Sequence, residues 1–502
     1  MTIMVGLDIG TTGARALAVD GSGQVLAAAS AEYRLYSPRP GWTEQNPEDW
    51  WQATRKVLVA VADAVRGQVA SLGLTGQMHG AVFLDSEDNV IRPALLWNDQ
   101  RTAAQCTEIT NRLGRDRLMT IAGNPALTGF QAPKVLWLRE AEPANYKRIA
   151  HVLLPKDYIR LRLAGEFATD ASDAAGTLLL DLRQRSWSAE ILDALEVPRE
   201  WLPAVYESPE VTGRLRADVS NELGLPAGIP IAAGGSDNAA AAVGSGIVEV
   251  GLASSSIGTS GVLFAYTPQF MPDPSGRLHA FCHAVPGAYH LMGVTLSAGG
   301  ALRWWRQVLG EQHEYDALIE FAASAPPGSE GLLFLPYLTG ERTPHSDPFA
   351  RGAFFGLTAR HNVAHLTRAV LEGVVYSLDD CLEIMTGLGI DVTQVRAIGG
   401  GARSSLWRQI QADVYGVPVH RTAVDEGPAY GAALLAGVAV GQFRSVQEAC
   451  SVIQLRPEVA EPGPSRTQLY RRYRDVYREL YPATAWAMSR LAELATDRGS
   501  AN

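Results

Sequence analysis

Short apolar runs separated by polar, glycine-containing turns dominate the first part of the chain. Three such runs follow one another at residues 4–8, 14–19 and 24–29. Runs of this length between turn residues are typical of strands, so we expect the chain to begin with three strands joined by tight turns. Asn46 and Pro47 then open a helix, because Asn is a favoured N-cap and Pro suits the first helical position. The apolar face of this helix continues to about Val65.

A second pattern occurs near the middle of the chain, where the apolar run 229–233 breaks at two glycines and presents Asp237. The small residues 239–246 that follow can begin a closely packed helix. An aspartate at the end of a buried strand, in a turn loosened by glycine, can reach a ligand in a cleft. The same aspartate would also serve as the N-cap of the following helix, and the local pattern does not choose between the two roles.

An internal repeat links the two halves of the chain. Ile9-Gly-Thr-Thr-Gly13 returns as Ile257-Gly-Thr-Ser-Gly261, and a predicted strand follows each copy. Glycines leave backbone N–H groups free for a phosphate and threonine hydroxyls add donors, although either copy alone also fits a plain hairpin turn. Asp8 lies beside the first copy and Asp237 near the second. The repeat therefore predicts two similar domains that face one cleft, each with one phosphate loop and one carboxylate.

Glycine-rich passages also occur twice more in the second half. Residues 296–306 form a glycine turn that opens a helix, and Gly399-Gly-Gly401 separates the predicted strand 392–398 from the helix 405–415. Bare backbone of this kind can admit a ribose or an adenine, and a tight strand–helix turn is the alternative. His79 follows another predicted strand in a glycine-flanked turn, where it suits either a contact in a cleft or a structural role.

Several further segments mix features of pockets and of structural anchors. Residues 97–101 and 154–158 combine aromatic and charged side chains, so either segment can line a pocket or anchor a surface. Residues 334–345 pass from a strand into a loop. Amphipathic spacing predicts a long helix over 363–386 and a final helix that begins near Ser465.

The composition is that of an ordinary globular protein with room for two domains: 502 residues, 47% hydrophobic and 19% charged. The net charge is −10 and no basic run occurs, which argues against a nucleic-acid partner. No uninterrupted apolar stretch of about 18 residues is present, and Asp8 interrupts the N-terminal run, so we expect neither a membrane span nor a signal peptide. The four cysteines are widely spaced without a CxxC pair, which favours a reducing cytoplasm over disulfides or a zinc site.

The chain lacks several common catalytic signatures. It contains no GxxxxGK[ST] loop, no HRD and DFG pair of a protein kinase, and no GxSxG elbow. What remains is two threonine–glycine loops, a third glycine-rich loop, and two aspartates at strand ends. Phosphoryl transfer from ATP needs such parts: amides and hydroxyls around the phosphates, a carboxylate near Mg²⁺, and a carboxylate base for the acceptor hydroxyl. We expect Mg²⁺ to be held loosely, by one carboxylate, water and the phosphates.

Eight motifs together resemble the FGGY carbohydrate kinases, and the resemblance extends over residues 3 to 485. The motifs are Gly6-Leu-Asp-Ile-Gly-Thr-Thr-Gly13, Gly76-Gln-Met-His79, Trp97-Asn-Asp-Gln-Arg101, Leu154-Pro-Lys-Asp-Tyr158, Gly235-Ser-Asp-Asn238, Ser256-Ile-Gly-Thr-Ser-Gly261, Gly340-Glu-Arg-Thr-Pro-His345 and Gly399-Gly-Gly-Ala-Arg-Ser404. Each motif is weak alone, and the combination is specific. The resemblance implies an α/β fold of two actin-like ATPase domains, ribonuclease H-like in type, around a central catalytic cleft.

The resemblance also divides the chain. It implies an N-terminal domain at 1–228 with the sugar site and the first phosphate loop, and a C-terminal domain at 229–464 with the catalytic base and the nucleotide site. A C-terminal helix at 465–502 follows, and packing of this helix back on the first domain is one expectation. The resemblance further allows a homodimer.

The implied reaction is transfer of the γ-phosphate of ATP to the C5 hydroxyl of D-xylulose. The stretches at 77–80 and 340–345 favour this sugar over glycerol. Kinases of the same family that act on ribulose, fuculose, gluconate or glycerol remain alternatives. An actin-like ATPase that works as a chaperone or filament subunit is an alternative of a different class.

Residue roles follow from the same resemblance. Asp237 is implied as the proton acceptor from the sugar hydroxyl, and Asp8 as the residue that positions Mg²⁺–ATP, reaching the metal through water. The implied sugar contacts are Gln77, Met78, His79, Asp237 and Asn238. The implied ATP contacts are Thr11, Thr12, Gly13 and Arg15 in the first loop, Gly258 and Thr259 in the second, and Gly299, Arg303, Gly400, Gly401 and Ser405 beyond it. Arg15 replaces the lysine of some relatives, and Ser236 stands where glycine is common.

Overall fold

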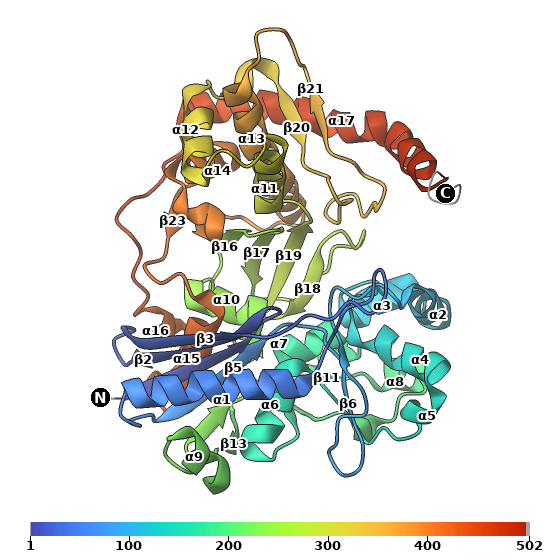
Figure 1. Cartoon of the computed structure of the whole chain (residues 1–502), viewed down its shortest axis with the longest axis vertical. Helices are drawn as coiled ribbons and strands as arrows, with labels where there is room; N and C mark the ends of the chain where they lie inside the picture. The colour runs from blue at the N-terminus through green and yellow to red at the C-terminus, as the bar shows by residue number, and fades with distance from the viewer. Residues whose placement is uncertain (1, 498–502) are drawn as a thin grey trace.

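The computed structural model describes residues 2–497 and divides them into two lobes, each built on a mixed β-sheet (Figure 1). The strands of the first sheet are β1 (Ile3–Ile9), β2 (Gly13–Asp20), β3 (Val25–Glu32), β5 (Ser71–Gly76), β13 (Val211–Arg214), β14 (Pro230–Ala232) and β15 (Gly235–Ser236). Their order is β13-β14-β5-β1-β2-β3, and β15 also pairs with β5. The first three strands form an antiparallel meander, whereas β5, β14 and β15 run parallel to β1.

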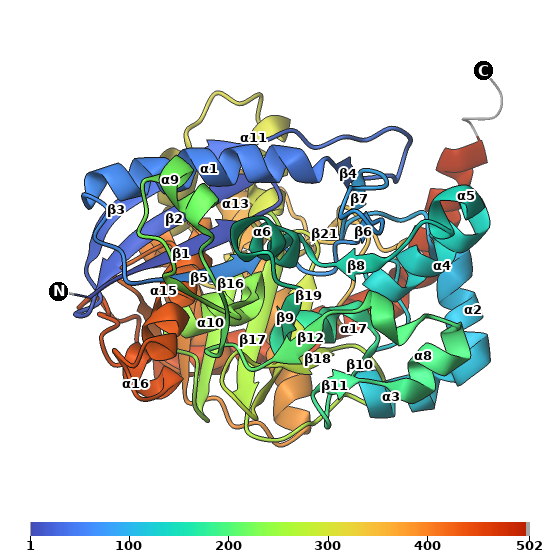
Figure 2. The ribbon, with the colours of Figure 1, turned by 90° about the horizontal axis from the view of Figure 1, so that it is seen from below.

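The N-terminal part folds as the hydrophobic pattern predicts. The three expected strands are confirmed as β1, β2 and β3. Helix α1 (Pro47–Ala64) begins directly after Asn46, whose side chain accepts a hydrogen bond from the backbone N–H of Glu48, so the predicted N-cap is confirmed. The buried face of α1 packs on β2 and β3 and covers one face of the first sheet (Figure 2).

The second sheet repeats the local topology of the first. Its strands are β16 (Leu252–Ile257), β17 (Gly261–Thr267), β18 (His279–Cys282), β19 (Tyr289–Thr295), β22 (Gln394–Ile398) and β23 (Val419–Arg421), in the order β18-β19-β17-β16-β22-β23. Strand β16 pairs with β17 antiparallel and with β22 parallel, just as β1 pairs with β2 and β5. The two copies of the threonine–glycine repeat therefore form equivalent hairpin turns, which confirms two similar domains.

One part of the predicted division is wrong. The expected boundary after residue 228 assigns the stretch that leads to Asp237 to the second domain. The structure instead pairs β14 and β15 with β5 in the first sheet, with Ile231 opposite Leu72 and Ser236 opposite Gly76. Asp8 therefore lies in β1 and Asp237 directly follows β15, so both carboxylates come from the first sheet and neither comes from the second. The sequence pattern identified the strand but could not identify its partner, because that partner lies far away along the chain.

Two helices pack against each other between the sheets, with almost no side chains separating them. They are α10 (Asp237–Ser245) and α15 (Gly427–Ala439), and α15 also lies on β1 and β5. A Cβ atom at Gly431 would collide with the carbonyl oxygen of Ala240, and one at Gly244 with that of Gly427. Glycines on β1 and β5, Gly6 and Gly73, meet α15 in the same way. These contacts fix α10 on the first sheet at backbone-to-backbone distance.

Helices cover the second sheet on the side away from the first lobe. They include α11 (Gly299–Val308), α12 (Tyr315–Ser324), α13 (Val363–Gly387), α14 (Ser405–Tyr415) and α17 (Pro464–Asp497). The expected starts of α13 and α17 are confirmed to within one residue. Helix α17 packs on α14 and α13, where Arg466 binds Asp413 and Arg474 binds Asp379, each at 2.7 Å. The expectation that this helix returns to the first domain is therefore wrong.

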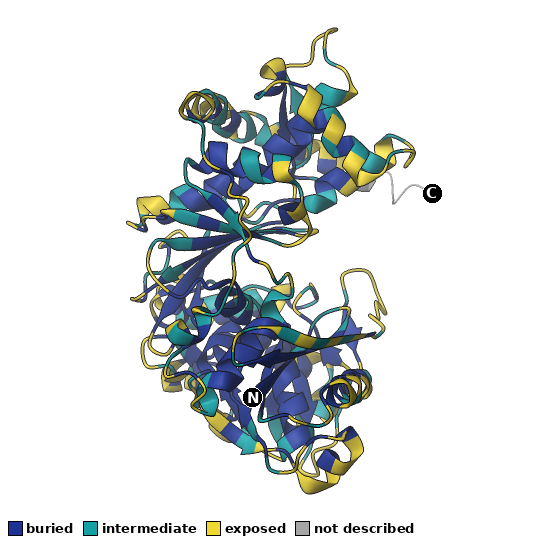
Figure 3. Ribbon diagram, turned by 90° about the vertical axis from the view of Figure 1, so that its left-hand side faces the viewer, coloured by how far each residue is buried: buried dark blue, intermediate teal, exposed yellow. Residues whose placement is uncertain are grey.

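The remaining elements surround this frame, mostly as a helical extension of the first lobe (Figure 2). They are β4 (Glu44–Gln45), β6 (Val82–Leu84), β7 (Ala94–Leu95), α2 (Ala103–Leu113), α3 (Arg115–Ala122), α4 (Gln131–Ala141), α5 (Pro143–Tyr146), β8 (His151–Leu153), α6 (Pro155–Ala164), β9 (Ala168–Asp170), α7 (Ala171–Ala174), β10 (Leu180–Asp181), β11 (Ser186–Trp187), α8 (Ala189–Leu195), β12 (Ala204–Tyr206), α9 (Ala217–Leu223), β20 (Leu333–Leu335), β21 (Ala353–Phe355) and α16 (Val446–Cys450). The sheets form the buried centres of the lobes, and exposed residues gather on outer helices and loops (Figure 3). Across residues 2–497, no helix is long and apolar enough to cross a membrane.

The contact between α10 and α15 predicts a stability effect. Gly431→Ala places a methyl group against the backbone of α10, so we expect the free energy of unfolding, measured by urea denaturation, to fall by about 1–3 kcal/mol. Gly387→Ala is the matched control, because a Cβ at that position of α13 meets nothing within 4 Å. The control should be neutral or stabilising by up to about 1 kcal/mol, since alanine favours helix over glycine. Equal effects of the two substitutions would contradict the proposed tightness of the contact.

Candidate active site

Three parallel strands of the first sheet end side by side, and each delivers a predicted site residue. Asp8 on β1 is opposite Thr75 on β5, and Gly235 on β15 is opposite the same Thr75 from the other side. Asp237 follows β15 directly, and residues 77–79 follow β5. Because neighbouring strands are 4.7–4.9 Å apart, the backbones of Asp8 and Gly235 lie about 10 Å apart across β5, and Asp237 lies two residues beyond Gly235. The sheet edge therefore presents two carboxylates that flank the predicted sugar-binding turn.

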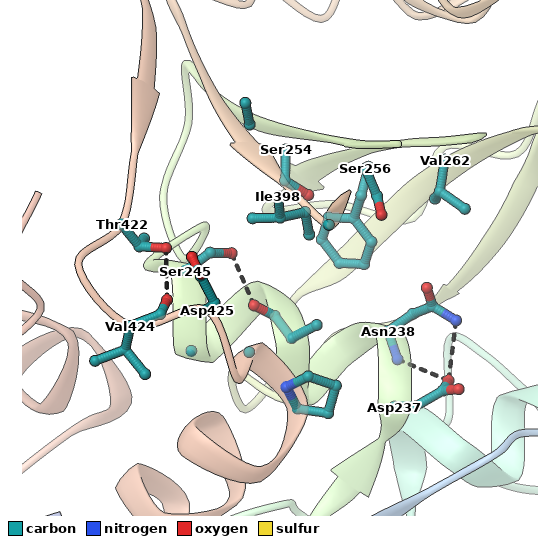
Figure 4. Close-up of a pocket in the computed structure, with 17 residues that line it drawn as sticks. Asp237, Asn238, Ser245, Ser254, Ser256, Val262, Ile398, Thr422, Val424 and Asp425 are labelled. Carbon is teal, nitrogen blue, oxygen red and sulfur yellow. Dashed lines mark hydrogen bonds between the residues drawn. The ribbon is translucent and has the colours of Figure 1, made fainter. Parts of the chain in front are cut away.

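Asp237 does not cap its helix, so the N-cap alternative for this residue is wrong. The N-cap of α10 is Ser236, whose hydroxyl accepts a hydrogen bond from the backbone N–H of Ala239 at 3.3 Å. Both hydrogen bonds to the Asp237 carboxylate come from Asn238, through its backbone N–H at 2.8 Å and its side-chain amide at 2.9 Å, and both end on Oδ1 (Figure 4). Burial raises the pKa of Asp237 to about 6, against the effect of these hydrogen bonds. The serine thus leaves the aspartate free for chemistry while α10 is still capped.

Asp8 is the more strongly perturbed carboxylate. Burial and the neighbouring charge of Asp237 raise its pKa to about 8, and the positive charge of Arg15 acts in the opposite direction. Within residues 2–497, the buried oxygen Oδ1 of Asp8 has no hydrogen-bond partner. A desolvated carboxylate oxygen without a donor fits a hydrated magnesium ion, which prefers oxygen ligands and would stabilise the ionised form.

Hydrogen bonds from neighbouring segments fix the first threonine–glycine loop, residues 10–13, in place. Its backbone closes through a hydrogen bond from Gly10 N–H to the Gly13 carbonyl at 3.1 Å. The side chain of Gln45 donates to the Thr11 carbonyl at 2.7 Å, and the indole N–H of Trp97 donates to the Thr11 hydroxyl at 3.0 Å. Thr11, Gly13 and Arg15 are at least partly accessible, and Thr12 is exposed.

Gln77 belongs to this support. Its side chain is 1% exposed and donates to the Gln45 side chain at 2.9 Å and, more weakly, to the Gly10 carbonyl at 3.4 Å. The structure therefore places Gln77 under the phosphate loop, where its side chain is almost wholly covered by the protein. The sugar contact of Gln77 stays a prediction, and the hydrogen bonds observed tie its amide nitrogen to Gly10 and Gln45.

Met78 and His79 form the wall between the two aspartates. The Nδ1 of His79 lies 2.6 Å from the Gly176 carbonyl, to which it can only donate, and the imidazole ring packs against Phe130 and Phe281. Burial lowers the pKa of His79 to about 3, so the ring is neutral and its Nε2 carries a lone pair. Met78 lies beneath, with its sulfur 3.7 Å from the side-chain nitrogen of Asn238. The wall thus combines an apolar surface with a hydrogen-bond acceptor.

A buried ion cluster supports the sheet edge from below. Lys156 Nζ contacts three carboxylates, those of Asp157 at 2.6 Å, Asp170 at 2.9 Å and Asp173 at 3.5 Å. Asp170 accepts from the hydroxyl of Ser172, and that hydroxyl accepts from the backbone N–H of Ser236 at 3.0 Å. The segment 154–158 is therefore a buried anchor, and a chain of polar contacts joins it to the turn that carries Asp237.

The predicted nucleotide positions of the second half surround one cavity of about 690 Å³. All seven line it: Gly258, Thr259, Gly299, Arg303, Gly400, Gly401 and Ser405. A Cβ at Gly299 would lie 2.6 Å from the Gly258 carbonyl oxygen, and the backbone N–H groups of Gly299 and Gly300 bond to the carbonyls of Gly258 and Thr259. The amino end of α11 thus fits directly onto the second threonine–glycine loop. Tyr315 and Trp407 add aromatic surface to this cavity, whose size suits a nucleoside.

A second, smaller cavity of about 250 Å³ lies between α10 and the second sheet. Asp237 and Asn238 line one end, and Ser254 and Ser256 on β16 point into it from the opposite sheet (Figure 4). The two lobes therefore meet around the amino end of α10. This cavity places Asp237 at the boundary between the lobes.

Comparison with known proteins agrees with this arrangement. The N-terminal domain of the FGGY family of carbohydrate kinases matches residues 3–244, and the C-terminal domain of the same family matches residues 253–440. The chain belongs to this family. Its α/β fold is the two-domain, actin-like ATPase fold of FGGY kinases.

Relatives of this FGGY kinase match along nearly its whole length. The xylulose kinase of Escherichia coli (strain K12) is 45% identical and covers 95% of this chain and 98% of the relative. The crystal structure of a "xyloylose kinase" from Brucella ovis is 40% identical, with a TM-score of 0.91 over 97% of this chain and 100% of that chain. The glycerol kinase of Plasmodium falciparum with ADP is 19% identical with a TM-score of 0.88 over 95% of this chain and 98% of that chain, which shows the shared fold.

Several residues of this FGGY kinase escaped the sequence reasoning. Ser236 was noted only as a departure from glycine, yet it caps α10. The buried contacts of Lys156 and Ser172 join residues from separate segments, and nothing in the local sequence signals them. Ser254 and Ser256 lie on one face of β16, but Ser255 between them is also a serine, so the sequence carries no alternation that marks this face.

The ion cluster predicts a large stability effect. In Lys156→Met three buried carboxylates lose their closest cation, so the free energy of unfolding should fall by about 3–5 kcal/mol in chemical denaturation. Lys56→Met, on the exposed side of α1, is the control and should change it by less than about 0.5 kcal/mol. If Lys156→Met were as stable as the control, the cluster would not hold the sheet edge.

Proposed function

We propose that this FGGY kinase transfers the γ-phosphate of ATP to the C5 hydroxyl of D-xylulose. The observation that carries the proposal is the single sheet edge on which Asp8, the wall of Met78 and His79, and Asp237 lie side by side. A separate cavity formed by glycines suits the nucleoside. The relatives named xylulose kinase, 45% and 40% identical over nearly the full length, support D-xylulose as the sugar.

Asp237 acts as the base in this proposal. A pKa of about 6 leaves its carboxylate ionised at neutral pH and still close enough to the operating pH to accept a proton. The hydroxyl of the sugar would donate to Oδ2 while Asn238 holds Oδ1. Proton acceptance of this kind contributes about 10²- to 10⁴-fold to the rate.

Met78 and His79 orient the sugar. The neutral His79 ring offers Nε2 as an acceptor for a sugar hydroxyl, because Nδ1 is used by the Gly176 carbonyl. Met78 offers an apolar surface for the carbon chain. Holding the hydroxyl in line with the phosphate supplies a large part of the acceleration, because the reaction partners then need no further alignment.

The two threonine–glycine loops would approach the phosphates of ATP from the two lobes, through Thr11, Thr12 and Gly13 and through Gly258 and Thr259. Arg15 would add charge on the first loop. Asp8 would hold Mg²⁺, through water, and the ion would supply neutralisation of the phosphate charge. Arg303, Gly299, Gly400, Gly401 and Ser405 would surround the nucleoside.

A coupled assay of ADP release with a panel of sugars tests the proposed substrate. With Mg²⁺–ATP present, D-xylulose should give the highest kcat/KM among D-xylulose, D- and L-ribulose, L-fuculose, gluconate and glycerol. A higher kcat/KM for another member of the panel would keep the mechanism and overturn the substrate. ATP binding without stimulation by any sugar would point to an actin-like ATPase of another kind.

Asp237→Asn tests the base. We expect kcat to fall by about 10²- to 10⁴-fold while the Kd for Mg²⁺–ATP stays within about twofold, because the amide cannot accept the proton but keeps the shape. Asp63→Asn, an exposed position on α1, is the matched control and should retain full activity.

The pH dependence accompanies this test. At saturating Mg²⁺–ATP, the kcat/KM of the wild-type enzyme for the sugar should rise with pH and level off above about pH 6, where Asp237 is deprotonated. Turnover of Asp237→Asn within a few-fold of the wild type would remove Asp237 as the base.

A further inference from the structure

The loop 340–345 carries a sequence motif to which the proposed mechanism assigns no role. It is fixed on both sides of Arg342. Glu341 is 2% exposed, and its Oε1 accepts from the backbone N–H of Leu296 at 2.9 Å and of Arg342 at 2.7 Å. Thr343 donates its hydroxyl to the Arg277 carbonyl at 2.8 Å, and its backbone N–H donates to the carbonyl of Val294 at 3.0 Å. The two neighbours thus anchor the loop at the end of β19.

The Arg342 side chain differs from both neighbours. It is half-buried, and no hydrogen bond or ion pair of its guanidinium occurs within residues 2–497. A guanidinium is costly to remove from water without acceptors, so an arginine in this state is suited to a ligand that supplies them. The anchored backbone on each side limits how far the side chain can move away.

The surroundings of Arg342 connect it with the sugar wall. Val294, to which the loop is bonded, lies two residues beyond Met292, and Met292 pairs with His279 on β18. His279 stacks on Phe281 with ring centroids 5.6 Å apart, and both rings contact Phe130, which in turn packs against His79. The loop is therefore bonded to β19 and to Arg277, two residues before His279, which belongs to the aromatic group that packs against His79.

The charge of Arg342 acts on this same group. After burial, which is the main cause, the positive charge of Lys134 and then that of Arg342 lower the pKa of His79, and the charge of Arg342 also lowers the pKa of His279. The arginine whose charge reaches Asp8 is Arg15 on the first phosphate loop. Arg15 therefore belongs to the first phosphate loop, whereas Arg342 belongs to the loop that is bonded to Arg277 and Val294.

We propose that Arg342 is a sugar-binding residue supplied by the second lobe, which donates hydrogen bonds to oxygens of the ketose held against His79. The inference rests on D-xylulose as the proposed substrate. A guanidinium can only donate hydrogen bonds, and the free nitrogen of His79 can only accept them. The pair can therefore bind an acceptor oxygen and a donor hydroxyl of the same sugar. A carbonyl oxygen can only accept, and Arg342 is therefore suited to the ketone end, remote from the hydroxyl that reacts. Contact from the second lobe would also couple sugar binding to closure of the cleft.

Arg342→Met tests this role, because methionine keeps the length of the apolar stem and removes all donors. We expect the KM for D-xylulose to rise by about 10- to 100-fold, since hydrogen bonds to charged groups contribute strongly. The KM for ATP should stay within about twofold of the wild-type value. In thermal unfolding without ATP, D-xylulose should stabilise the wild-type protein and fail to stabilise the variant at the same concentration.

Two further variants separate recognition from folding. Arg342→Lys keeps a donor and the charge, so it should recover part of the lost affinity for D-xylulose. Arg360→Met removes an exposed arginine that pairs with Glu330 at 3.5 Å, and it should leave both KM values unchanged. Equal increases in the KM for ATP and for D-xylulose, or a KM for D-xylulose within twofold of the wild type, would overturn the inference. A wild-type enzyme that does not phosphorylate D-xylulose would instead overturn the proposed function, and this inference with it.

Discussion

The backbone contact between α10 and α15 is the constraint on which the rest of the structure depends. Glycines at Gly244 and Gly431 let the two helices touch without intervening side chains, and Gly6 and Gly73 let α15 lie directly on β1 and β5. This stack joins a helix from each half of the chain to one sheet. Because Asp237 is the first residue of α10, the same contact sets the position of the proposed base.

Two buried carboxylates, those of Asp8 and Asp237, dominate the electrostatics of the sheet edge. Their pKa values are raised mainly because burial disfavours the charged form, and neither carboxylate forms an ion pair within residues 2–497. Nearby groups support this arrangement: Ser236 caps the helix in place of Asp237, and Lys156 offsets part of the negative charge of the carboxylates below the turn. The site therefore keeps its acidic groups desolvated and available, a state that a substrate hydroxyl and hydrated Mg²⁺ would relieve.

Local patterns in the sequence predicted local structure well. The meander β1–β3, the cap at Asn46 and the repeated hairpin turns all depend on neighbours within a few residues, and all are confirmed. The partner of β14 was missed because strand pairing is decided by packing across the fold. Gln77 shows that the sequence is limited in the same way for side chains of the site. Its motif correctly predicts a position next to the first threonine–glycine loop. Only the folded structure shows that its amide nitrogen donates to Gly10 and Gln45.

A crystal structure of the enzyme with D-xylulose and a non-hydrolysable ATP analogue would test the account most directly. The account predicts the nucleoside in the cavity of about 690 Å³ lined by Gly299, Gly400 and Gly401. It also predicts the C5 hydroxyl of the sugar within about 2.6–3.2 Å of a carboxylate oxygen of Asp237. A sugar bound with every hydroxyl beyond reach of Asp237, in a closed cleft with the nucleotide present, would contradict it.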